Sequence, residues 1–268
     1  MKKHQKRKEN GGLLDLEVVI TARNEAKMIG DCLESIKGFG EVLVLDLNSD
    51  DNTAKISQNF GAKTVNLPWK GFDYAGPRNK ARELVDKSWI LYLDADERLT
   101  PALKQEINFI IQNGFGKFVA YAIPRRNFIL GKEFKHTGQW PDYVIRLFRK
   151  DKFNGWKGKV HEQAEFEGEL GHLRNPMIHD KHETISEMVE KTNNWSNIEA
   201  KLLFDSNHPK MSWWRFIRIM VTELTKRLIV QKGYLDGASG VVYSLYQTWS
   251  RFVTYAKLWE MQSKNIKI

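Results

Sequence analysis

WILYLDADE, at residues 89–97, is an apolar run that ends in two carboxylates separated by one residue. Five bulky apolar side chains in succession are typical of a strand that is buried on both faces of a parallel sheet. Asp94 and Asp96 then lie at the carboxyl end of this strand, which is where open α/β sheets bind their ligands. The stretch therefore predicts a parallel sheet with an acidic pair at its ligand-binding edge.

The neighbouring segments extend this pattern. Strand-like apolar runs occupy residues 16–21, 41–47 and 63–67. Helical spacing of apolar residues occupies residues 25–37, 53–60, 76–86 and 101–113. Strands that alternate with helices across residues 14–113 predict an α/β fold, in which helices flank a mostly parallel, Rossmann-like sheet.

The composition fits one folded domain with an appendage. The chain has 268 residues, of which 41% are hydrophobic and 28% are charged, as in ordinary folded domains. Residues 118–180 contain short strand-like segments, and residues 184–268 are helical and amphipathic in character. Residues 1–13 are basic and are expected to form a flexible tail.

Charge, cysteine content and hydropathy narrow the range of possible partners and cellular compartments. The net charge of +9 indicates an anionic partner: nucleic acid, an acidic membrane surface or a phosphorylated substrate. The single cysteine, Cys32, excludes an internal disulfide framework and fits a reducing cytoplasm, and the helical spacing around it predicts a buried structural thiol. Neither a secretory signal nor a transmembrane helix is expected, because no suitable apolar run occurs.

Asp94 and Asp96 are the strongest candidates for a chemical role. Two carboxylates at a strand end can hold one divalent cation, and their hard oxygens suit Mn²⁺ or Mg²⁺, which can bridge a diphosphate. Asp46 lies in the second strand-like run and places a further acid at the same edge of the sheet. A solvated acidic turn is the alternative interpretation of the acidic pair.

Two further segments reach that edge. VVITARNE, residues 18–25, runs from a strand into a polar turn, and DLNSDDNT, residues 46–53, is rich in side chains that bond a base or a ribose. Capping of the next helix by Ser49 or Asp51 is the alternative role of the second segment, and both roles can coexist. The candidate nucleotide-sugar-binding residues of these segments are Thr21, Ala22, Arg23, Glu25, Asp46 and Ser49.

Four motifs across residues 15–113 resemble family-2 glycosyltransferases with the GT-A fold: T-A-R-N-E, D-x-x-S-x-D-x-T, P-R-N-x-A and L-D-A-D-E. The resemblance implies transfer of a hexose from a nucleotide-diphosphate sugar, with a UDP-sugar favoured. It also implies that Asp46 binds uracil or ribose and that Arg78 approaches the diphosphate. Asp94, Ala95 and Asp96 would surround the donor and a Mn²⁺ or Mg²⁺ ion.

The chain departs from the family's pattern in one motif and lacks another. The usual D-D-G-S-x-D-G-T is D-L-N-S-D-D-N-T here, at residues 46–53. The Q-x-x-R-W signature of processive polysaccharide synthases is absent, and so are runs that would form their membrane helices. The resemblance therefore implies a non-processive enzyme that adds a single sugar.

Motifs in the second half extend the resemblance to about residues 15–260. W-P-D at 140–142, R-L-F-R at 146–149, V-H-E at 160–162 and K-G-Y-L-D-G at 232–237 resemble the lipopolysaccharide-core β-1,4-glucosyltransferase group. This implies a glycan or lipid-linked acceptor, in lipopolysaccharide core or other cell-envelope glycan synthesis. The expected domain is then residues 14–182, with a donor half at 14–113 and an acceptor half at 114–182.

An inverting transfer needs a carboxylate that takes the proton from the acceptor hydroxyl. We expect this base in the acceptor half, with Glu162 as first choice and Asp142 as second. The alternative for Glu162 is an exposed loop acid that pairs with Lys157 or Lys159. 

Two histidines and two arginines have open roles. His179 is a candidate metal ligand, and His161 could bind the metal or the diphosphate or position the base; a structural role is the alternative for each. Arg146 and Arg149 lie in an alternating strand-like segment. One of them could reach a phosphate, with plain surface charge as the alternative.

The helical extension, residues 183–268, combines tryptophan, tyrosine and cationic residues on amphipathic helices. This mixture suits a bilayer interface, so peripheral association with an anionic membrane is expected, on the cytoplasmic face of the inner membrane. Helices packed on the catalytic domain, or a dimer contact, are the alternatives.

Two other functions compete with glycosyl transfer. A nucleotidyltransferase on the same fold would open with a glycine-rich phosphate loop, which TARNEAK at residues 21–27 does not match. A membrane-surface or nucleic-acid binding protein without transferase activity is the non-enzymatic alternative. No RNA-reading module is evident, so no nucleic-acid partner is expected.

Overall fold

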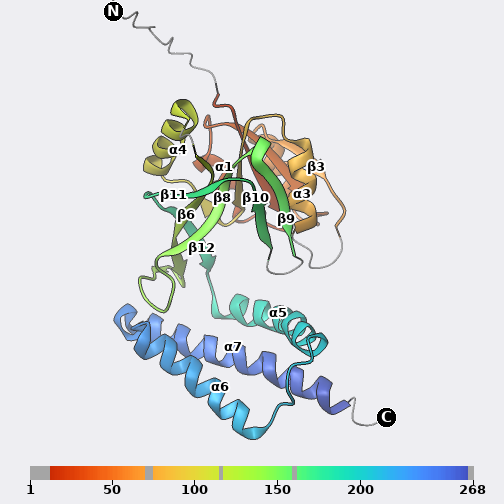
Figure 1. Ribbon diagram of the computed structural model, residues 1–268, viewed down its shortest axis with the longest axis vertical. Helices are drawn as coiled ribbons and strands as arrows, with labels where there is room; N and C mark the ends of the chain where they lie inside the picture. Colours follow the sequence, from red (N-terminus) through yellow and green to blue (C-terminus); the bar gives the residue numbers. More distant parts are fainter. Residues whose placement is uncertain (1–12, 70–74, 115–116, 159–161, 265–268) are drawn as a thin grey trace, which may run out of the picture. The chain divides into compact units, whose positions relative to one another are not determined.

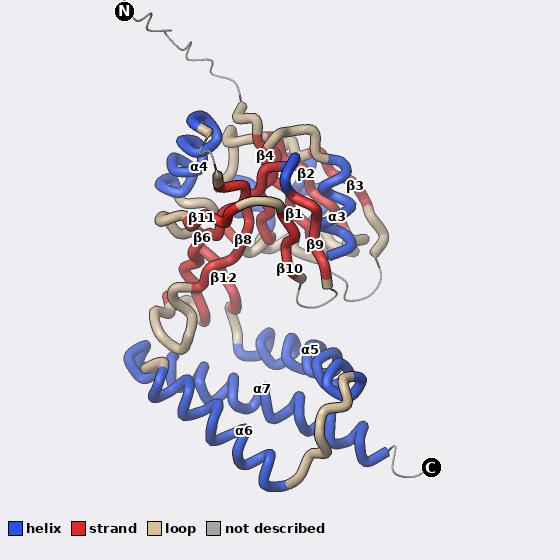
Figure 2. The backbone as a smooth tube through the Cα atoms, in the orientation of Figure 1, coloured by secondary structure: helices blue, strands red, loops and turns tan. Residues whose placement is uncertain are grey.

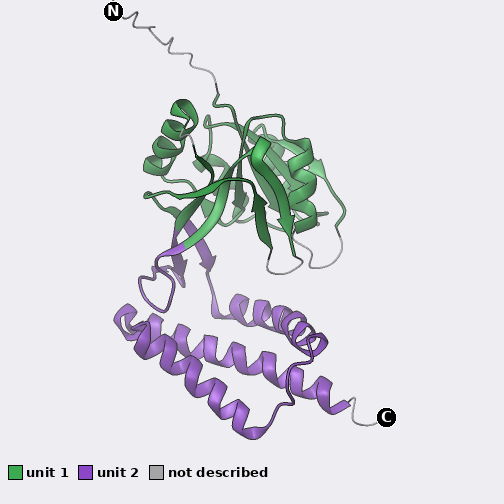
Figure 3. Cartoon of the chain, in the orientation of Figure 1, with its two compact units in different colours: residues 1–124, 143–177 green, residues 125–142, 178–268 purple. Residues whose placement is uncertain are grey.

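The computed structural model describes residues 13–69, 75–114, 117–158 and 162–264. The chain forms two compact units: residues 1–124 with 143–177, and residues 125–142 with 178–268 (Figure 3). It therefore passes between the units three times. The predicted tail at residues 1–13 lies outside the described residues except for its last member. The predicted functional division, at residues 113 and 182, stays a prediction.

Four parallel strands form one side of the sheet in the first unit: β1 (Leu16–Ala22), β2 (Glu41–Asp46), β3 (Lys63–Asn66) and β4 (Trp89–Asp94). Their order is β3-β2-β1-β4, and β1 pairs in parallel with both β2 and β4. The strand β3, which is labelled in Figure 1, is the outermost of the four. Helices make the crossovers that parallel neighbours require. The predicted fold class, an α/β domain with a mostly parallel sheet flanked by helices, is confirmed.

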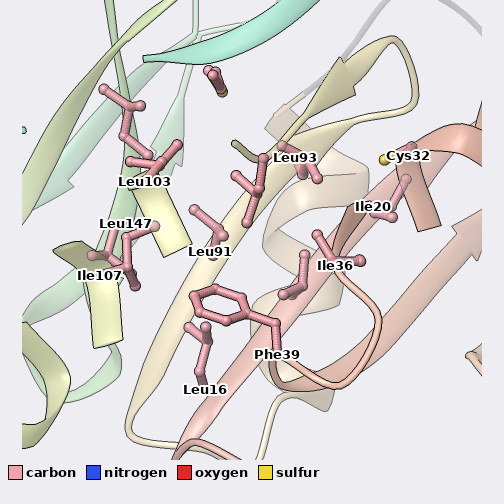
Figure 4. Close-up of a cluster of buried hydrophobic side chains, with 14 of the residues drawn as sticks. Leu16, Ile20, Cys32, Ile36, Phe39, Leu91, Leu93, Leu103, Ile107 and Leu147 are labelled. Carbon is pink, nitrogen blue, oxygen red and sulfur yellow. The ribbon is translucent and has the colours of Figure 1, made fainter. Parts of the chain in front are cut away.

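Helices of the first unit cover both faces of these strands: α1 (Ile29–Ser35), α2 (Thr53–Asn59), α3 (Ala75–Leu84) and α4 (Pro101–Asn113). Alternate side chains of β1 enter two different cores. Ile20 joins a cluster with Cys32 of α1 and Ile107 of α4 (Figure 4), whereas Val19 joins a cluster with Ala81 of α3. Burial on both faces explains why β1, β2 and β4 are mainly apolar, whereas the edge strand β3 is polar and partly exposed.

The start and end of α4 follow from its sequence. Thr100 Oγ1 accepts a hydrogen bond from the backbone N–H of Leu103 at 3.2 Å, and Pro101 occupies the first turn. Gly114 ends the helix with a φ of +59°, a left-handed conformation that glycine adopts without steric cost. The predicted span of this helix is thus confirmed.

Further strands complete the sheets: β5 (Glu97–Arg98), β6 (Phe118–Ile129), β7 (Lys132–Glu133), β8 (Asp142–Arg149), β9 (Phe153–Lys157), β10 (Gln163–Phe166), β11 (Glu169–His172) and β12 (Met177–His182). The main sheet continues from β4 in the order β8-β6-β12-β5, with β8 antiparallel to β4. β9 and β10 form a separate antiparallel pair. A 3₁₀ turn at Lys150–Lys152 joins β8 to β9.

The second unit is largely helical (Figure 2): α5 (Ile185–Asp205), α6 (Trp213–Thr225), a π-helical turn (Lys226–Val230), a 3₁₀ turn (Gly233–Asp236) and α7 (Gly237–Lys264). Both α5 and α6 pack against α7. The predicted helical extension is therefore present. Among the described residues, no helix is long and apolar enough to cross a membrane.

The K-G-Y-L-D-G motif has a structural role within the second unit. The Asp236 carboxylate, which is buried, accepts hydrogen bonds from the backbone N–H groups of Lys135 and His136, at 3.2 and 3.0 Å. It also lies 2.9 Å from Nδ1 of His136. Gly240 leaves no room for a Cβ atom, which would lie 2.0 Å from the carbonyl oxygen of Gly233. The motif thus fixes the start of α7 against residues 132–136.

Candidate functional site

Strand register brings the predicted acids to one edge of the sheet. Ala22 is paired with Asp46, and Thr21 is paired with Asp94, so the two acids flank the end of β1. Asp46 is buried, and Asp94 is half-buried. Asp96 follows Asp94 after the buried Ala95 and is half-buried as well. The carboxyl ends of β2 and β4 therefore present carboxylates on either side of the end of β1, as expected for a ligand-binding edge.

Two loops beside Asp46 are tied to each other by hydrogen bonds. The Ser49 hydroxyl donates to the Asp46 carboxylate and accepts from the backbone N–H of Asn24 at 2.9 Å. Asn24 Oδ1 in turn accepts from the backbone N–H of Asp50 at 2.8 Å. Two of the predicted binding residues thus contact each other directly, whereas Arg23 is exposed.

The capping alternative applies to Asp51. Its carboxylate accepts hydrogen bonds from the backbone N–H groups of Thr53, at 2.9 Å, and Ala26, at 3.1 Å. Desolvation opposes ionisation of Asp51, but the hydrogen bonds from Thr53 and Ala26 outweigh it and lower the pKa of the carboxyl. Glu25 is held nearby, since its backbone N–H donates to Thr53 Oγ1 at 2.8 Å.

Asp94 is held by two arginines. One carboxylate oxygen accepts from Arg78 at 2.7 Å, and the other accepts from Arg146. Arg146 also donates to Glu97 Oε1 at 2.8 Å, and Glu97 Oε2 accepts from the backbone N–H of Asp94 at 2.9 Å. Arg146 and Glu97 are almost fully buried. Together they fix both the backbone and the side chain of Asp94.

The charge of Arg146 is stabilised by its partners. Burial disfavours the charged guanidinium, but the carboxylates of Asp94 and Glu97 outweigh this and raise its pKa above the usual range. Its Nε is buried and makes no hydrogen bond with the described residues. The surface-charge interpretation is therefore wrong for Arg146, whereas Arg149 is half-buried and pairs with Asp151 at 2.7 Å.

Arg78 joins Asp94 to the first-choice base. Its guanidinium donates to Glu162 as well as to Asp94, and it lies 5.0 Å from the centre of the Trp156 ring. Asn79, the next residue of α3, hydrogen-bonds to both the backbone N–H and the carbonyl of Trp156. Glu162 is thus not the exposed loop acid of the alternative interpretation. Lys157 pairs with Glu165 instead, at 3.2 Å.

The oxygen donors at this edge fit a small, hard divalent cation. Among the described residues, no three His, Cys, Asp or Glu side chains are grouped closely enough to enclose a metal ion. Mg²⁺ and similar ions are commonly bound by one or two carboxylates, with phosphates and water as the remaining ligands. Asp94 and Asp96 are two such carboxylates, and a cation here would share the Asp94 oxygens with Arg78 and Arg146.

The remaining candidates lie elsewhere. Asp142 and His179 belong to the second unit, where Asn127 joins them: its Oδ1 lies 2.6 Å from His179 Nδ1, and its Nδ2 donates to Asp142 at 3.0 Å. Burial opposes ionisation of Asp142, but the Arg125 guanidinium, at 2.7 Å, and Asn127 outweigh it and lower the pKa. His161 lies outside the described residues.

Two buried residues of the site have roles that the motifs did not reveal. Glu97 belongs to the L-D-A-D-E motif, but the motif alone does not indicate a role for it. A run of three acids within four residues directly after a buried strand is the signal that could have drawn attention to it. Arg146 lies in β8, and only the antiparallel pairing of β8 with β4 brings it near Asp94.

Cys32 is expected to resist alkylation in the folded protein at pH 8. Its side chain is completely buried, and burial raises the pKa of the thiol well above its usual range, so the reactive thiolate is scarce. The thiol donates to the carbonyl oxygen of Asp94 at 3.6 Å. Intact-mass measurement after iodoacetamide treatment should show modification in urea only. Rapid modification of the native protein would contradict this structural role.

Comparison with known proteins identifies similar sequences. The family model described as "Glycosyl transferase family 2" matches residues 17–166. An uncharacterized glycosyltransferase of Rickettsia felis is 29% identical over an alignment 267 residues long, which covers 94% of this chain and 92% of that protein. The lipopolysaccharide core biosynthesis glycosyltransferase LpsC of Rhizobium meliloti is 27% identical over 257 residues, covering 92% of this chain and 93% of LpsC.

One solved structure aligns with most of the chain. The structure of S. aureus TarS 1-349 in complex with UDP is 12% identical and aligns with a TM-score of 0.44. The alignment covers 93% of this chain and 91% of that one.

Proposed function

We propose that this chain, which belongs to glycosyl transferase family 2, moves a hexose from a nucleotide-diphosphate sugar to a hydroxyl group of a glycan or lipid-linked acceptor. Family membership makes the chain a glycosyltransferase, so the alternative of a binding protein without transferase activity is not retained. The proposed transfer is inverting, non-processive and dependent on Mn²⁺ or Mg²⁺, with a UDP-sugar as the favoured donor.

One observation carries the proposal: Arg78 contacts Asp94 on one side and Glu162 on the other. A guanidinium is planar and presents paired N–H donors that match the oxygens of a phosphate. The same side chain therefore links the acid of the proposed donor edge to the proposed base. A donor diphosphate bound beside Asp94 would compete with Glu162 for this guanidinium.

This competition suggests how the base becomes available. When the diphosphate draws Arg78 away, the Glu162 carboxylate loses its cationic partner and can accept the proton of the acceptor hydroxyl. The oxygen of that hydroxyl then attacks the anomeric carbon from the face opposite the departing diphosphate, which inverts the configuration. Arg146 and Glu97 keep Asp94 in place during this exchange. A divalent cation at Asp94 and Asp96 would neutralise the charge that builds on the leaving diphosphate.

Asp142 is retained as the second candidate for the base. Its contacts with Arg125 and Asn127 favour the ionised form that a base requires. His179, joined to Asp142 through Asn127, is better supported as a partner of that carboxylate than as a metal ligand. 

The similarity to LpsC supports an acceptor in lipopolysaccharide core synthesis. If the acceptor is lipid-linked, as we propose, the reaction would take place at the cytoplasmic face of the inner membrane. The acceptor would carry a free sugar hydroxyl, and a nucleoside diphosphate would be released as the second product.

A thermal-shift series of nucleotide sugars, with and without Mn²⁺, tests the donor and the cation. A ligand at about 100 times its Kd stabilises the folded protein by about 2.7 kcal/mol, which for a chain of this size raises Tm by several degrees. We expect one UDP-sugar to raise Tm further with Mn²⁺ than without it. In Asp96→Asn this dependence on Mn²⁺ should disappear.

Asp151→Asn is the matched control, because Asp151 is an exposed acid that pairs with Arg149. It should keep the full shift. If no nucleotide sugar changes Tm, or if Mn²⁺ has the same effect on Asp96→Asn as on the wild type, the proposed donor site is wrong.

A further inference from the structure

Helix α6 of the second unit has two apolar faces, and only one of them is packed. Phe216 and Ile219 pack against a core formed by α5, α7 and Met211. The Phe216 ring lies 5.7 Å from the ring of Phe252 in α7. No residue of α6 is fully buried, however, which is unusual for a helix so rich in tryptophan, phenylalanine and isoleucine.

The second face consists of large apolar side chains exposed to solvent. Trp213, Ile217 and Val221 recur at intervals of four residues, which places them on one side of the helix. The exposed fractions in α6 are 74% for Trp213, 58% for Trp214, 47% for Ile217, 39% for Met220 and 58% for Val221. The π-helical turn that follows adds Ile229 and Val230, exposed by 63% and 70%.

The surroundings of this face are strongly cationic. Residues 206–235 contain six lysine and arginine side chains and one carboxylate, Glu223. Glu223 pairs with Arg227. Within the described part of the chain, the other five cationic side chains have no carboxylate within ion-pair distance: Lys210, Arg215, Arg218, Lys226 and Lys232.

We propose that this apolar face of α6, with its neighbouring cationic side chains, docks on an anionic lipid bilayer. Tryptophan side chains favour the boundary between acyl chains and headgroups, and a helix that lies in this boundary buries an apolar face while its basic residues contact lipid phosphates. Arg218 and Lys226 are exposed and lie on the same helix and on its continuation. A protein partner would have to supply a complementary acidic surface, whereas an anionic leaflet supplies it everywhere.

The proposal concerns the second unit and does not rest on the donor chemistry of the first. Vesicle binding can be measured without any donor or acceptor, so a failure of one proposal leaves the other intact. A second copy of this chain is the competing occupant of the face.

Flotation of the full-length protein with lipid vesicles provides the test. We expect binding to vesicles that contain about 30% phosphatidylglycerol, weak binding to pure phosphatidylcholine, and loss of binding as salt is raised. Arg218→Gln with Lys226→Gln should weaken binding by about fivefold for each charge removed. Trp213→Ser with Ile217→Ser should weaken it by at least tenfold at any salt concentration.

Phe60→Ser is the matched control, because Phe60 is an exposed aromatic residue of the first unit, with 42% of its surface exposed. It should bind like the wild type. The double charge variant changes only exposed side chains, so it remains informative if the apolar variant folds poorly. Equal binding to neutral and anionic vesicles would overturn the proposal. So would a wild-type dimer in sedimentation velocity that the Trp213→Ser, Ile217→Ser variant lacks, because the face would then belong to a second copy.

Discussion

Replacing Glu162 by glutamine is expected to lower kcat by about 10²- to 10⁴-fold, the usual contribution of a general base. Glutamine has the same size and keeps an oxygen that can accept from Arg78, but it cannot take the proton of the acceptor hydroxyl. Asp94 would retain both arginine contacts, and the neutral amide would compete less than the carboxylate with the donor diphosphate for Arg78, so donor binding should not weaken. Steady-state kinetics, together with donor affinity from thermal shifts, would show a loss in kcat and an equal or higher donor affinity.

Glu165→Gln is the control for this experiment. Glu165 lies in β10, close to Glu162 in sequence, and pairs with Lys157 at the surface. Its replacement should leave kcat unchanged. A Glu162→Gln enzyme with nearly full activity would remove Glu162 as the base. Asp142→Asn then separates the two candidates, since a large loss of kcat in that variant alone would assign the role to Asp142.

Replacing Arg146 by methionine is expected to destabilise the protein by about 3–5 kcal/mol, the cost of leaving a buried charge without its partner. Glu97 is completely buried and would lose its charged donor, and Asp94 would lose one of its two arginines. Methionine fills most of the volume, so the loss comes chiefly from charge. Urea unfolding followed by tryptophan fluorescence would measure it as a lower midpoint.

Two further variants serve as a matched control and as a test of charge compensation. Arg149→Met changes the same residue type in the same strand, but Arg149 forms a partly exposed pair with Asp151, so the expected loss is below about 1 kcal/mol. Glu97→Gln added to Arg146→Met should recover part of the stability, because the orphaned charge is then gone. If Arg146→Met unfolds at the same urea concentration as Arg149→Met, the buried network does not stabilise the fold.

The parallel strands β1, β2 and β4 were predictable because their sequences are mainly apolar. β1, β2 and β4 end within one residue of the predicted positions. The bounds of α4 were also predictable, because Thr100 caps its start and Gly114 ends it. The strands after residue 118 could not be ordered in this way, because their pairing joins residues far apart in sequence. Nothing local indicates that β8 lies between β4 and β6.

The candidate site shows the same limit. Asp46 and Asp94 could be placed together from strand ends alone, since parallel register brings those ends to one edge. The contact of Arg146 with Asp94 could not be predicted, because it depends on the pairing of β8 with β4. The contact of Arg78 with Glu162 could not be predicted either, because it depends on where the fold places residue 162. Motifs identified Arg78 and Glu162 separately, and the contact between them is a property of the folded chain.

The chain passes three times between its units, and this limits how one unit could be exchanged for that of another protein. Residues 125–142 reach the second unit from within the sheet-forming half of the sequence, and Phe134 of this segment packs on Tyr243 of α7, with ring centres 5.3 Å apart. Ile129 belongs to the same cluster as Met188 of α5. A single junction at the last boundary, near residue 177, would therefore separate Ile129 and Phe134 from Met188 and Tyr243. Chimeric enzymes that exchange the second unit between relatives would therefore need three junctions, near residues 124, 142 and 177.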